Sequence, residues 1–156
     1  MAFAVLEPVD AGNWLTCIQL QVDDAQRRFV ASNVFSLAQA KVSDRYVPLA
    51  ICDGEHPDVM VGFAMYGPHL PSLVPWIDRL MIDRRFQGRG FGRAAMRELM
   101  ARIQREWPGP VRISYEPDNR AAEALYASLG FELTGEMLEG EWVREWRPPG
   151  GAGAGA

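Results

Sequence analysis

The sequence of 156 residues is poor in cysteine, with only Cys17 and Cys52. The two thiols lie far apart, show no metal-binding or redox spacing, and are too few for a disulfide-stabilised scaffold. No apolar run approaches the roughly 20 residues that a membrane span requires. The short apolar run at the N-terminus lacks the basic flank of a secretion signal. These absences predict a soluble protein in a reducing, cytoplasmic setting, with no membrane partner.

An excess of basic charge is also missing. The chain has 16 Lys and Arg against 20 Asp and Glu, a net charge of -4, and a pI near 5.2. Binding to nucleic acid requires clustered and uncompensated basic side chains, so we expect no nucleic-acid partner. A small cationic ligand is compatible with this balance, although mild acidity also serves solubility alone.

The hydrophobic fraction of 48% is enough for one core at this length, and a second catalytic domain has no room. We expect one domain over residues 1–147 and a flexible Gly/Ala tail over 148–156. Apolar periodicity predicts an α/β (mixed α+β) fold with helices on both faces of a mixed sheet. Strands are predicted at 3–9, 45–52, 59–66, 76–82, 111–115, 131–137 and 141–146, helices at 13–20, 31–40, 91–107 and 119–129, and a rigid proline-rich loop at 67–75.

The strongest local signal lies at residues 83–104, where a strand enters a turn with three glycines and a helix follows directly. Glycines lack a Cβ, so successive N–H groups can converge on one point, and the helix N-terminus adds unpaired donors and a positive dipole end. This layout predicts an anion cradle, and the surrounding arginines favour a phosphate-bearing ligand. The residues concerned are Gly88, Gly90 and Gly92, with Arg84, Arg85, Arg89 and Arg93.

Three kinds of phosphate site can be weighed against this loop. A P-loop needs a lysine followed by Ser or Thr, which is absent. A dinucleotide fold needs G-x-G-x-x-G early in a βαβ unit, whereas this loop comes after several predicted elements. The third pattern fits, because Gln87-x-x-Gly90-x-Gly92 resembles the acetyl-CoA pyrophosphate motif of the GNAT N-acetyltransferases. A glycine-rich helix entry without a ligand is the alternative.

A second stretch, residues 116–131, resembles the other signature of that family. The resemblance implies that Asn119 bonds the pantetheine arm and that Tyr126 protonates the departing CoA sulfur as general acid. Their spacing of seven residues places both on one helix face. An ordinary N-cap and a core tyrosine are the alternatives. The implied acetyl-CoA contacts are Leu80, Met81, Ile82, Gln87, Gly88, Arg89, Gly90, Phe91, Gly92, Arg93, Asn119, Ala122 and Tyr126.

Four further segments, NWLTCIQLQV, QRRFVASNVFSLAQA, VGFAMYG and TGEMLEGEWV, are similar to the branch of diamine, spermidine and spermine N-acetyltransferases. The resemblance implies the GNAT fold with a mostly antiparallel sheet, acetyl-CoA as cosubstrate without a metal, acetylation of a primary amine of a polyamine or diamine, and a homodimer. Acetylation of an aminoglycoside or another amine antibiotic is an alternative. A non-catalytic acyl-CoA-binding sensor is a second one.

The acceptor side depends on carboxylates. We expect Asp78 to be the general base, through a relaying water, with Glu116 as second choice; a solvated carboxylate or a partner for Arg79 is the alternative. A polycation needs acidic groups and an aromatic wall along a groove. The candidates are Asp23, Asp24, Glu136, Glu139 and Trp76, and further candidates are Glu141, Trp14 and Trp142. The cysteines lie outside the motifs, so direct attack in a ternary complex is expected. His56 and His69 receive no role.

Overall fold

The computed structural model describes residues 1–150, so residues 151–156 of the predicted tail lie outside the described part. The elements follow in the order β1 (Ala4–Pro8), α1 (Trp14–Gln19), η1 (Asp24–Phe29), α2 (Asn33–Val42), β2 (Val47–Asp53), β3 (Met60–His69), β4 (Val74–Ile82), η2 (Arg84–Phe86), α3 (Phe91–Glu106), β5 (Val111–Tyr115), α4 (Arg120–Ser128), β6 (Glu132–Leu138) and β7 (Glu141–Trp146). No helix among residues 1–150 has the length and apolarity of a membrane span.

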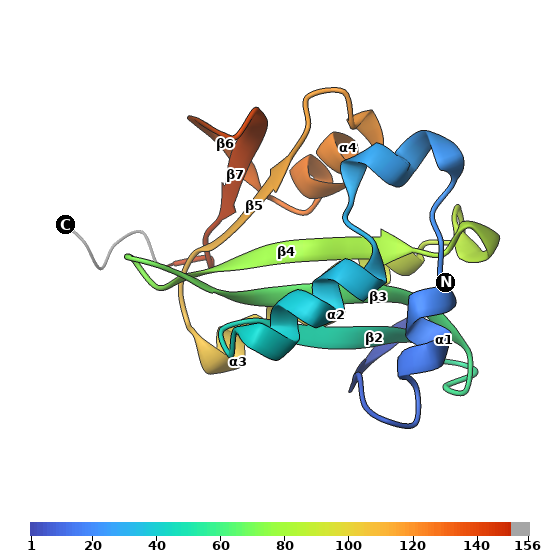
Figure 1. The fold of residues 1–156 in the computed structure, drawn as a ribbon. Coiled ribbons are helices and arrows are strands. Elements are labelled where there is room, and N and C mark those ends of the chain that lie inside the picture. Colours follow the sequence, from blue (N-terminus) through green and yellow to red (C-terminus); the bar gives the residue numbers. More distant parts are fainter. Residues whose placement is uncertain (151–156) are drawn as a thin grey trace.

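The seven strands form one sheet in the order β1-β2-β3-β4-β5-β7-β6. Every neighbouring pair is antiparallel except β4 and β5, which run parallel. Figure 1 shows β5, β6 and β7 turning away from the flat body formed by the first four strands. The predicted fold class, a mixed and mostly antiparallel sheet with helices on both faces, is confirmed.

The alternation of side chains along β2 and β3 divides the core between the two faces of the sheet. Leu49, Ile51 and Ala64 face α3, whereas Ala50, Cys52 and Phe63 face α1 and α2. In Figure 1, α1 and α2 lie in front of the sheet and α3 behind it. Helix α3 buries the stripe that its sequence predicts, Phe91, Ala95, Met96, Leu99 and Ile103.

Two local predictions are wrong, and one short helix was missed. The segment 67–75 is not a loop, because β3 runs on to His69 and β4 starts at Val74; Pro68 and Pro75 pair with each other at the hairpin end, where fewer backbone donors are needed. Asn13 does not cap α1 with its side chain, which instead accepts from Asp10 N–H and donates to Pro8 O. A short 3-10 helix, η1, was not predicted.

Candidate active site

The parallel pair of β4 and β5 opens into a cleft. The two strands are paired only at Trp76 with Arg112 and at Ile77 with Ile113. Beyond these pairs the strands separate, and a cavity of about 700 Å³ lies at their carboxyl ends, lined also by η1, the glycine loop and α4. This is the usual place for a ligand where neighbouring parallel strands part.

The separation leaves backbone groups of β4 facing the cavity. Asp83 N–H donates to Val61 O of β3 at 2.8 Å, in register with the pair of Ile82 and Gly62. Because backbone groups alternate sides along a strand, the N–H groups of Leu80 and Ile82 point toward the β5 side. Both residues line the cavity, as does Met81. The sequence analysis predicts contacts with acetyl-CoA at these same three residues, Leu80, Met81 and Ile82.

The glycine loop forms the cavity wall at the start of α3. Gly88 and Gly90 have φ of 77° and 89°, the left-handed region that other residues rarely adopt. A Cβ added at Gly88 would meet nothing within 4 Å, whereas one on Gly92 would touch side chains of Leu125 and Ile82. The loop therefore leaves room beside its backbone N–H groups, and the N-terminus of α3 at Phe91 follows directly.

The side chain of Gln87 is already engaged. Its Nε2 donates to Ile82 O at 2.9 Å and to Gln26 Oε1 at 2.8 Å. Gln87 thus ties the loop to β4 and to η1, which covers one side of the cavity. Gln87 also lines the cavity, and its two hydrogen bonds hold the loop in shape.

Helix α4 forms the opposite wall. Asn119 caps it, with Oδ1 accepting from Ala122 N–H at 3.2 Å, and both residues line the cavity. The N-cap reading of Asn119 is confirmed. The cap uses only the carbonyl oxygen and leaves the amide N–H₂ available, so the contact with the pantetheine arm stays a prediction. Gly130 at φ 94° ends the helix, and Phe131 N–H returns to Tyr126 O at 3.0 Å, as the sequence predicts.

Tyr126 is 7% exposed and still lines the cavity. Its ring packs between Tyr115 and Phe131, at centroid distances of 5.9 and 6.1 Å. Burial, with smaller contributions from Glu141 and Tyr115, raises the pKa of the Tyr126 phenol above its ordinary value. The hydroxyl is consequently protonated at neutral pH and can donate.

Asp78 has an unexpected partner at the other side of the cavity. His69 Nε2 lies 2.6 Å from Asp78 Oδ1, and the imidazole stacks on Trp76 at 4.9 Å between centroids. All three residues line the cavity. Arg79 does not pair with the Asp78 carboxylate, because its guanidinium donates to Asp78 O, Ser36 and Gln39. No sequence pattern predicts this pair, because the prolines between the two residues argue against a hairpin.

Two more carboxylates line the cavity, Glu139 and Glu141, in the turn and first residue of β7. Glu141 Oε1 accepts from Ser114 Oγ at 2.7 Å. Ser114 follows Ile113, the last β5 residue paired with β4, so Glu141 and Asp78 flank the point where the two strands part. Three carboxylates, those of Asp78, Glu139 and Glu141, thus line the same cavity as Trp76.

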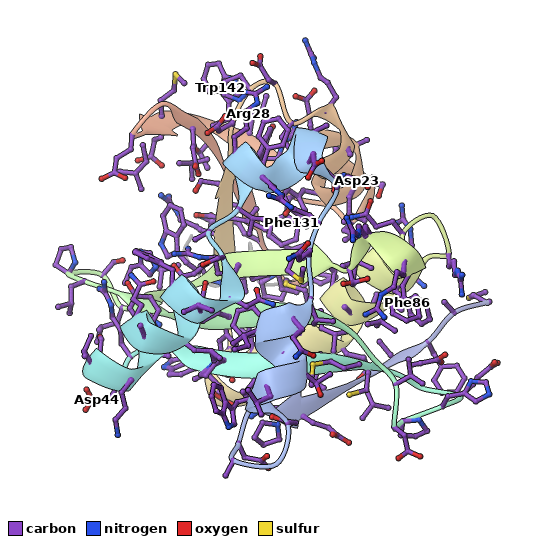
Figure 2. All side chains as sticks on the ribbon, turned by 45° about the vertical axis from the view of Figure 1, so that its right-hand side comes forward. Asp23, Arg28, Asp44, Phe86, Phe131 and Trp142 are labelled. Carbon is purple, nitrogen blue, oxygen red and sulfur yellow. The ribbon has the colours of Figure 1, made fainter. Side chains whose placement is uncertain are left out.

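Other predicted residues lie outside the cavity lining. Glu116 Oε2 lies 3.5 Å from Arg28 of η1, and the same guanidinium lies 3.5 Å from Asp118. Figure 2 labels Arg28 and Asp23 at the two ends of η1; Arg28 lines the cavity, but Asp23 and Asp24 do not. Arg89 lies over the Phe86 ring, and neither it nor Arg93 lines the cavity.

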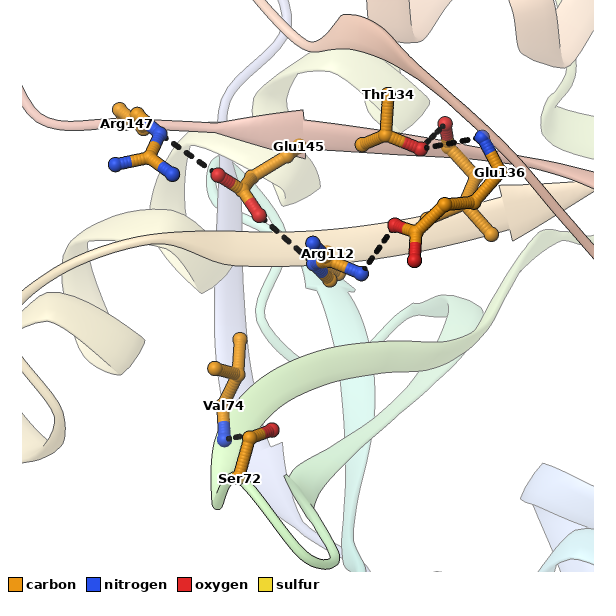
Figure 3. Close-up of polar contacts among 8 residues, drawn as sticks. Ser72, Val74, Arg112, Thr134, Glu136, Glu145 and Arg147 are labelled. Atoms are coloured by element: carbon orange, nitrogen blue, oxygen red, sulfur yellow. Dashed lines mark hydrogen bonds and ion pairs between the residues drawn. The ribbon is translucent and has the colours of Figure 1, made fainter.

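Glu136 belongs to a separate charged group. Its Oε2 pairs with Arg112 Nη1 at 2.7 Å, while Arg112 Nε binds Glu145, which also pairs with Arg147 (Figure 3). These residues line a second, polar hollow on β5, β6 and β7. The structure therefore places Glu136 with Arg112 and not with the three cavity carboxylates. Within residues 1–150, no group of three or more His, Cys, Asp or Glu is arranged to hold a metal.

A cleft between parting parallel strands, with a glycine loop at a helix N-terminus and a buried tyrosine opposite, defines a coenzyme-dependent acyltransferase site. The model of the Acetyltransferase (GNAT) family matches residues 14–131. The chain belongs to this family of acetyl-CoA-dependent N-acetyltransferases.

Relatives of known function cover most of the chain. It is 29% identical over 152 residues to the spermine/spermidine N(1)-acetyltransferase of Bacillus subtilis (strain 168), covering 88% of this chain and 94% of the relative. Its fold matches a spermidine N-acetyltransferase from Vibrio cholerae solved with CoA and spermine, at TM-score 0.69 and 16% identity over 91% of this chain and 92% of that one. A domain from Methanocaldococcus jannaschii DSM 2661 matches at TM-score 0.76 and 15% identity, covering 95% and 100%.

Proposed function

We propose that this enzyme transfers the acetyl group of acetyl-CoA to a primary amine of a polyamine or diamine, by direct attack in a ternary complex. The observation that carries the proposal is the set of acidic and aromatic side chains in the cavity, which Asp78, Glu139, Glu141 and Trp76 all line. Carboxylates and an aromatic face are the groups that bind a flexible polycation. The 29% identity to a spermine/spermidine acetyltransferase supports the same acceptor class.

The residues of the cleft fit acetyl-CoA, which supplies an activated acetyl thioester. Gly88 and Gly90 hold backbone N–H groups and free space for a pyrophosphate. The Asn119 amide would hold the pantetheine arm, and the N–H groups of Leu80 and Ile82 would polarise the thioester carbonyl. Two such donors stabilise negative charge on that oxygen, and loss of one typically costs about 10²-fold or more in rate.

Proton transfer requires an acid and a base on opposite sides of the acetyl carbon. Tyr126 is protonated because it is buried, and it donates to the departing sulfur. On the acceptor side, Asp78 takes part in removing the ammonium proton, because its carboxylate is free of Arg79 and lies in the cavity. Glu116 is the weaker candidate, since it is engaged by Arg28 outside the cavity lining.

Neither cysteine supports a covalent acetyl-enzyme. Cys17 and Cys52 are buried in the cluster under α1 and α2 and do not line the cavity. Burial raises the pKa of both thiols to about 11, with Glu7 adding to the effect at Cys52. Thiolate nucleophiles are therefore absent at neutral pH from the described part of the chain.

A substrate panel tests the proposal. Release of free CoA from acetyl-CoA is measured with spermidine, spermine, putrescine and an aminoglycoside as acceptors. We expect turnover with at least one polyamine, and the double substitution Glu139→Gln/Glu141→Gln should raise the polyamine KM by about tenfold, equivalent to ~1.4 kcal/mol. Glu136→Gln is the matched control, with KM within about twofold because its partner is Arg112. Turnover confined to the aminoglycoside would replace the polyamine by the antibiotic as acceptor.

A further inference from the structure

His69 and Asp78 meet through two features of the β3–β4 hairpin. His69 ends β3 opposite Val74, and its ring crosses Trp76 to reach Asp78. The pairing of β4 with β3 slips by one residue here, because Met65 pairs with Arg79 and Tyr66 pairs with Ile77. Asp78 is thus the extra residue of a β-bulge, a feature that often directs a side chain into a functional site.

The Asp78 carboxylate is costly to keep where it lies. Its side chain is 9% exposed, and Oδ2 is the only buried side-chain oxygen or nitrogen without a hydrogen-bond partner within residues 1–150. Such an atom loses its hydration without compensation, and in native structures it is rare enough to require a reason. An imidazolium at His69, bonded to Oδ1, would stabilise the charge of this carboxylate.

We propose that His69 is the general base of the reaction and that Asp78 positions it, an inference that rests on the proposed amine acetylation. With Nε2–H donating to Asp78 Oδ1, the lone pair of the ring lies on Nδ1, which forms no hydrogen bond within residues 1–150. Asp78 fixes this tautomer and stabilises the imidazolium, as the carboxylate does in a Ser-His-Asp arrangement. His69 is 26% exposed, so an acceptor in the cavity can reach it.

The proton balance is complete with these groups. The acceptor enters as an ammonium ion, and one proton passes to His69 Nδ1 and then to solvent. The freed lone pair forms the C–N bond to the acetyl carbon. As the C–S bond breaks, Tyr126 gives its proton to the sulfur, and the nitrogen returns one proton to the Tyr126 oxygen. The products are the neutral amide and the free thiol.

An imidazole suits this step better than a carboxylate alone. As a chemical type it titrates near neutral pH, where a general base is most effective, whereas a carboxyl group titrates near pH 4. The other charged or titratable groups that line the same cavity come from η1, β4, β5, α4 and the β6–β7 turn, and they are Arg28, Arg79, Tyr115, Tyr126, Glu139 and Glu141. Arg79 and Arg28 are engaged by other partners, and a guanidinium cannot act as a base; His69 is the imidazole among the groups that line the cavity.

The test compares His69→Ala and His69→Gln with His56→Ala. His56 is the matched control, because it also lies 3.4 Å from an aspartate, Asp53, but in the exposed β2–β3 turn. The readout is kcat/KM from pH 6 to 10, for whichever amine the wild type acetylates. We expect both His69 variants to lose about 10²- to 10³-fold at pH 7. The loss should shrink toward pH 10, where the amine is deprotonated in solution.

Chemical rescue distinguishes a base from a structural pair. Added imidazole should raise the rate of His69→Ala at least tenfold and leave His56→Ala unchanged. His69→Gln can keep a hydrogen bond to Asp78, so recovery of the wild-type rate in that variant would overturn the proposal. So would a pH-independent defect or an absence of rescue in a folded His69→Ala enzyme. The substrate panel tests the acceptor class separately. If the wild-type enzyme acetylates no polyamine, the proposed acceptor class is refuted, and the role of His69 is then tested with the amine that is acetylated.

Discussion

Asp83 joins the chain before η1 to the glycine loop, and its replacement should weaken the whole donor side of the cleft. Its carboxylate is 3% exposed. Oδ2 accepts from Gln21 N–H at 2.9 Å, and Oδ1 accepts from Arg85 N–H at 3.0 Å and from Arg85 Nε at 2.8 Å. The backbone continues the connection, since Arg84 N–H donates to Gln21 O at 2.8 Å.

The substitution Asp83→Asn keeps the shape and removes the charge. Its N–H₂ group must face one of the three donors, so one hydrogen bond to a charged acceptor is lost, at about 1.5–3 kcal/mol, and one buried N–H loses its partner, at about 1–3 kcal/mol. We expect a loss of about 3–5 kcal/mol in the free energy of unfolding. For a chain of this length that corresponds to a fall in Tm of roughly 6–20 °C.

The pH dependence gives an independent check. Burial raises the pKa of Asp83, but the hydrogen bonds from the Arg85 side chain and the N–H groups of Gln21 and Arg85 outweigh it, so the pKa lies below its ordinary value. The stabilisation is therefore complete above the unfolded-state pKa near 4 and is lost as the pH falls through the folded-state pKa. The difference between wild type and Asp83→Asn should shrink below about pH 4.

Urea unfolding at pH 7 and at pH 3 measures both effects. Asp44→Asn is the control, because Asp44 is exposed at the end of α2 (Figure 2) and has no hydrogen bond or ion pair within residues 1–150; it should change stability by less than about 0.5 kcal/mol. A change below ~1 kcal/mol for Asp83→Asn at pH 7, or a difference that grows toward pH 3, would refute the assigned role of this carboxylate.

Four further outcomes are expected. Tyr126→Phe should lower kcat about 10²-fold with little change in the Kd for CoA by calorimetry, and unchanged turnover would remove Tyr126 as the acid. Gly88→Ala should cost about 1–2 kcal/mol of stability in denaturant unfolding because of its positive φ, and should raise the acetyl-CoA KM by a larger factor. Cys17 and Cys52 should resist alkylation at pH 8 in the folded enzyme, and labelling without unfolding would contradict their raised pKa. Sedimentation velocity tests the predicted homodimer, which a monomer at micromolar concentration would contradict.

Elements with strong local signals could be predicted from the sequence. Helix α3 shows four apolar residues at helical spacing, and Asn119 and Gly130 mark the two ends of α4, so burial and capping act within one segment. The β3–β4 hairpin could not be predicted, because Pro68 and Pro75 argue against strands unless they pair at a hairpin end. The contact of His69 with Asp78 could not be predicted either, because it depends on the register in which β3 pairs with β4.

Which carboxylates line the cavity could not be predicted from the sequence either. Glu136 and Glu139 are three residues apart and looked alike, yet one pairs with Arg112 outside the cavity and the other lines it. Gly135 has a φ of 85°, and the pairing of β6 with β7 shifts between Leu133 and Met137. An irregular register of this kind changes which face a side chain occupies, and no periodic pattern predicts it.

One irregularity in β4 connects the two halves of the site. Pairing of β4 with β5 ends at Ile77, and the bulge begins at the next residue, Asp78. A bulge bends its strand and increases the local twist, so the backbone that follows turns away from β5 and frees the N–H groups of Leu80 and Ile82. The same extra residue carries the carboxylate that holds His69. The contact of His69 with Asp78 and the unpaired backbone of the cleft therefore both depend on a single inserted residue.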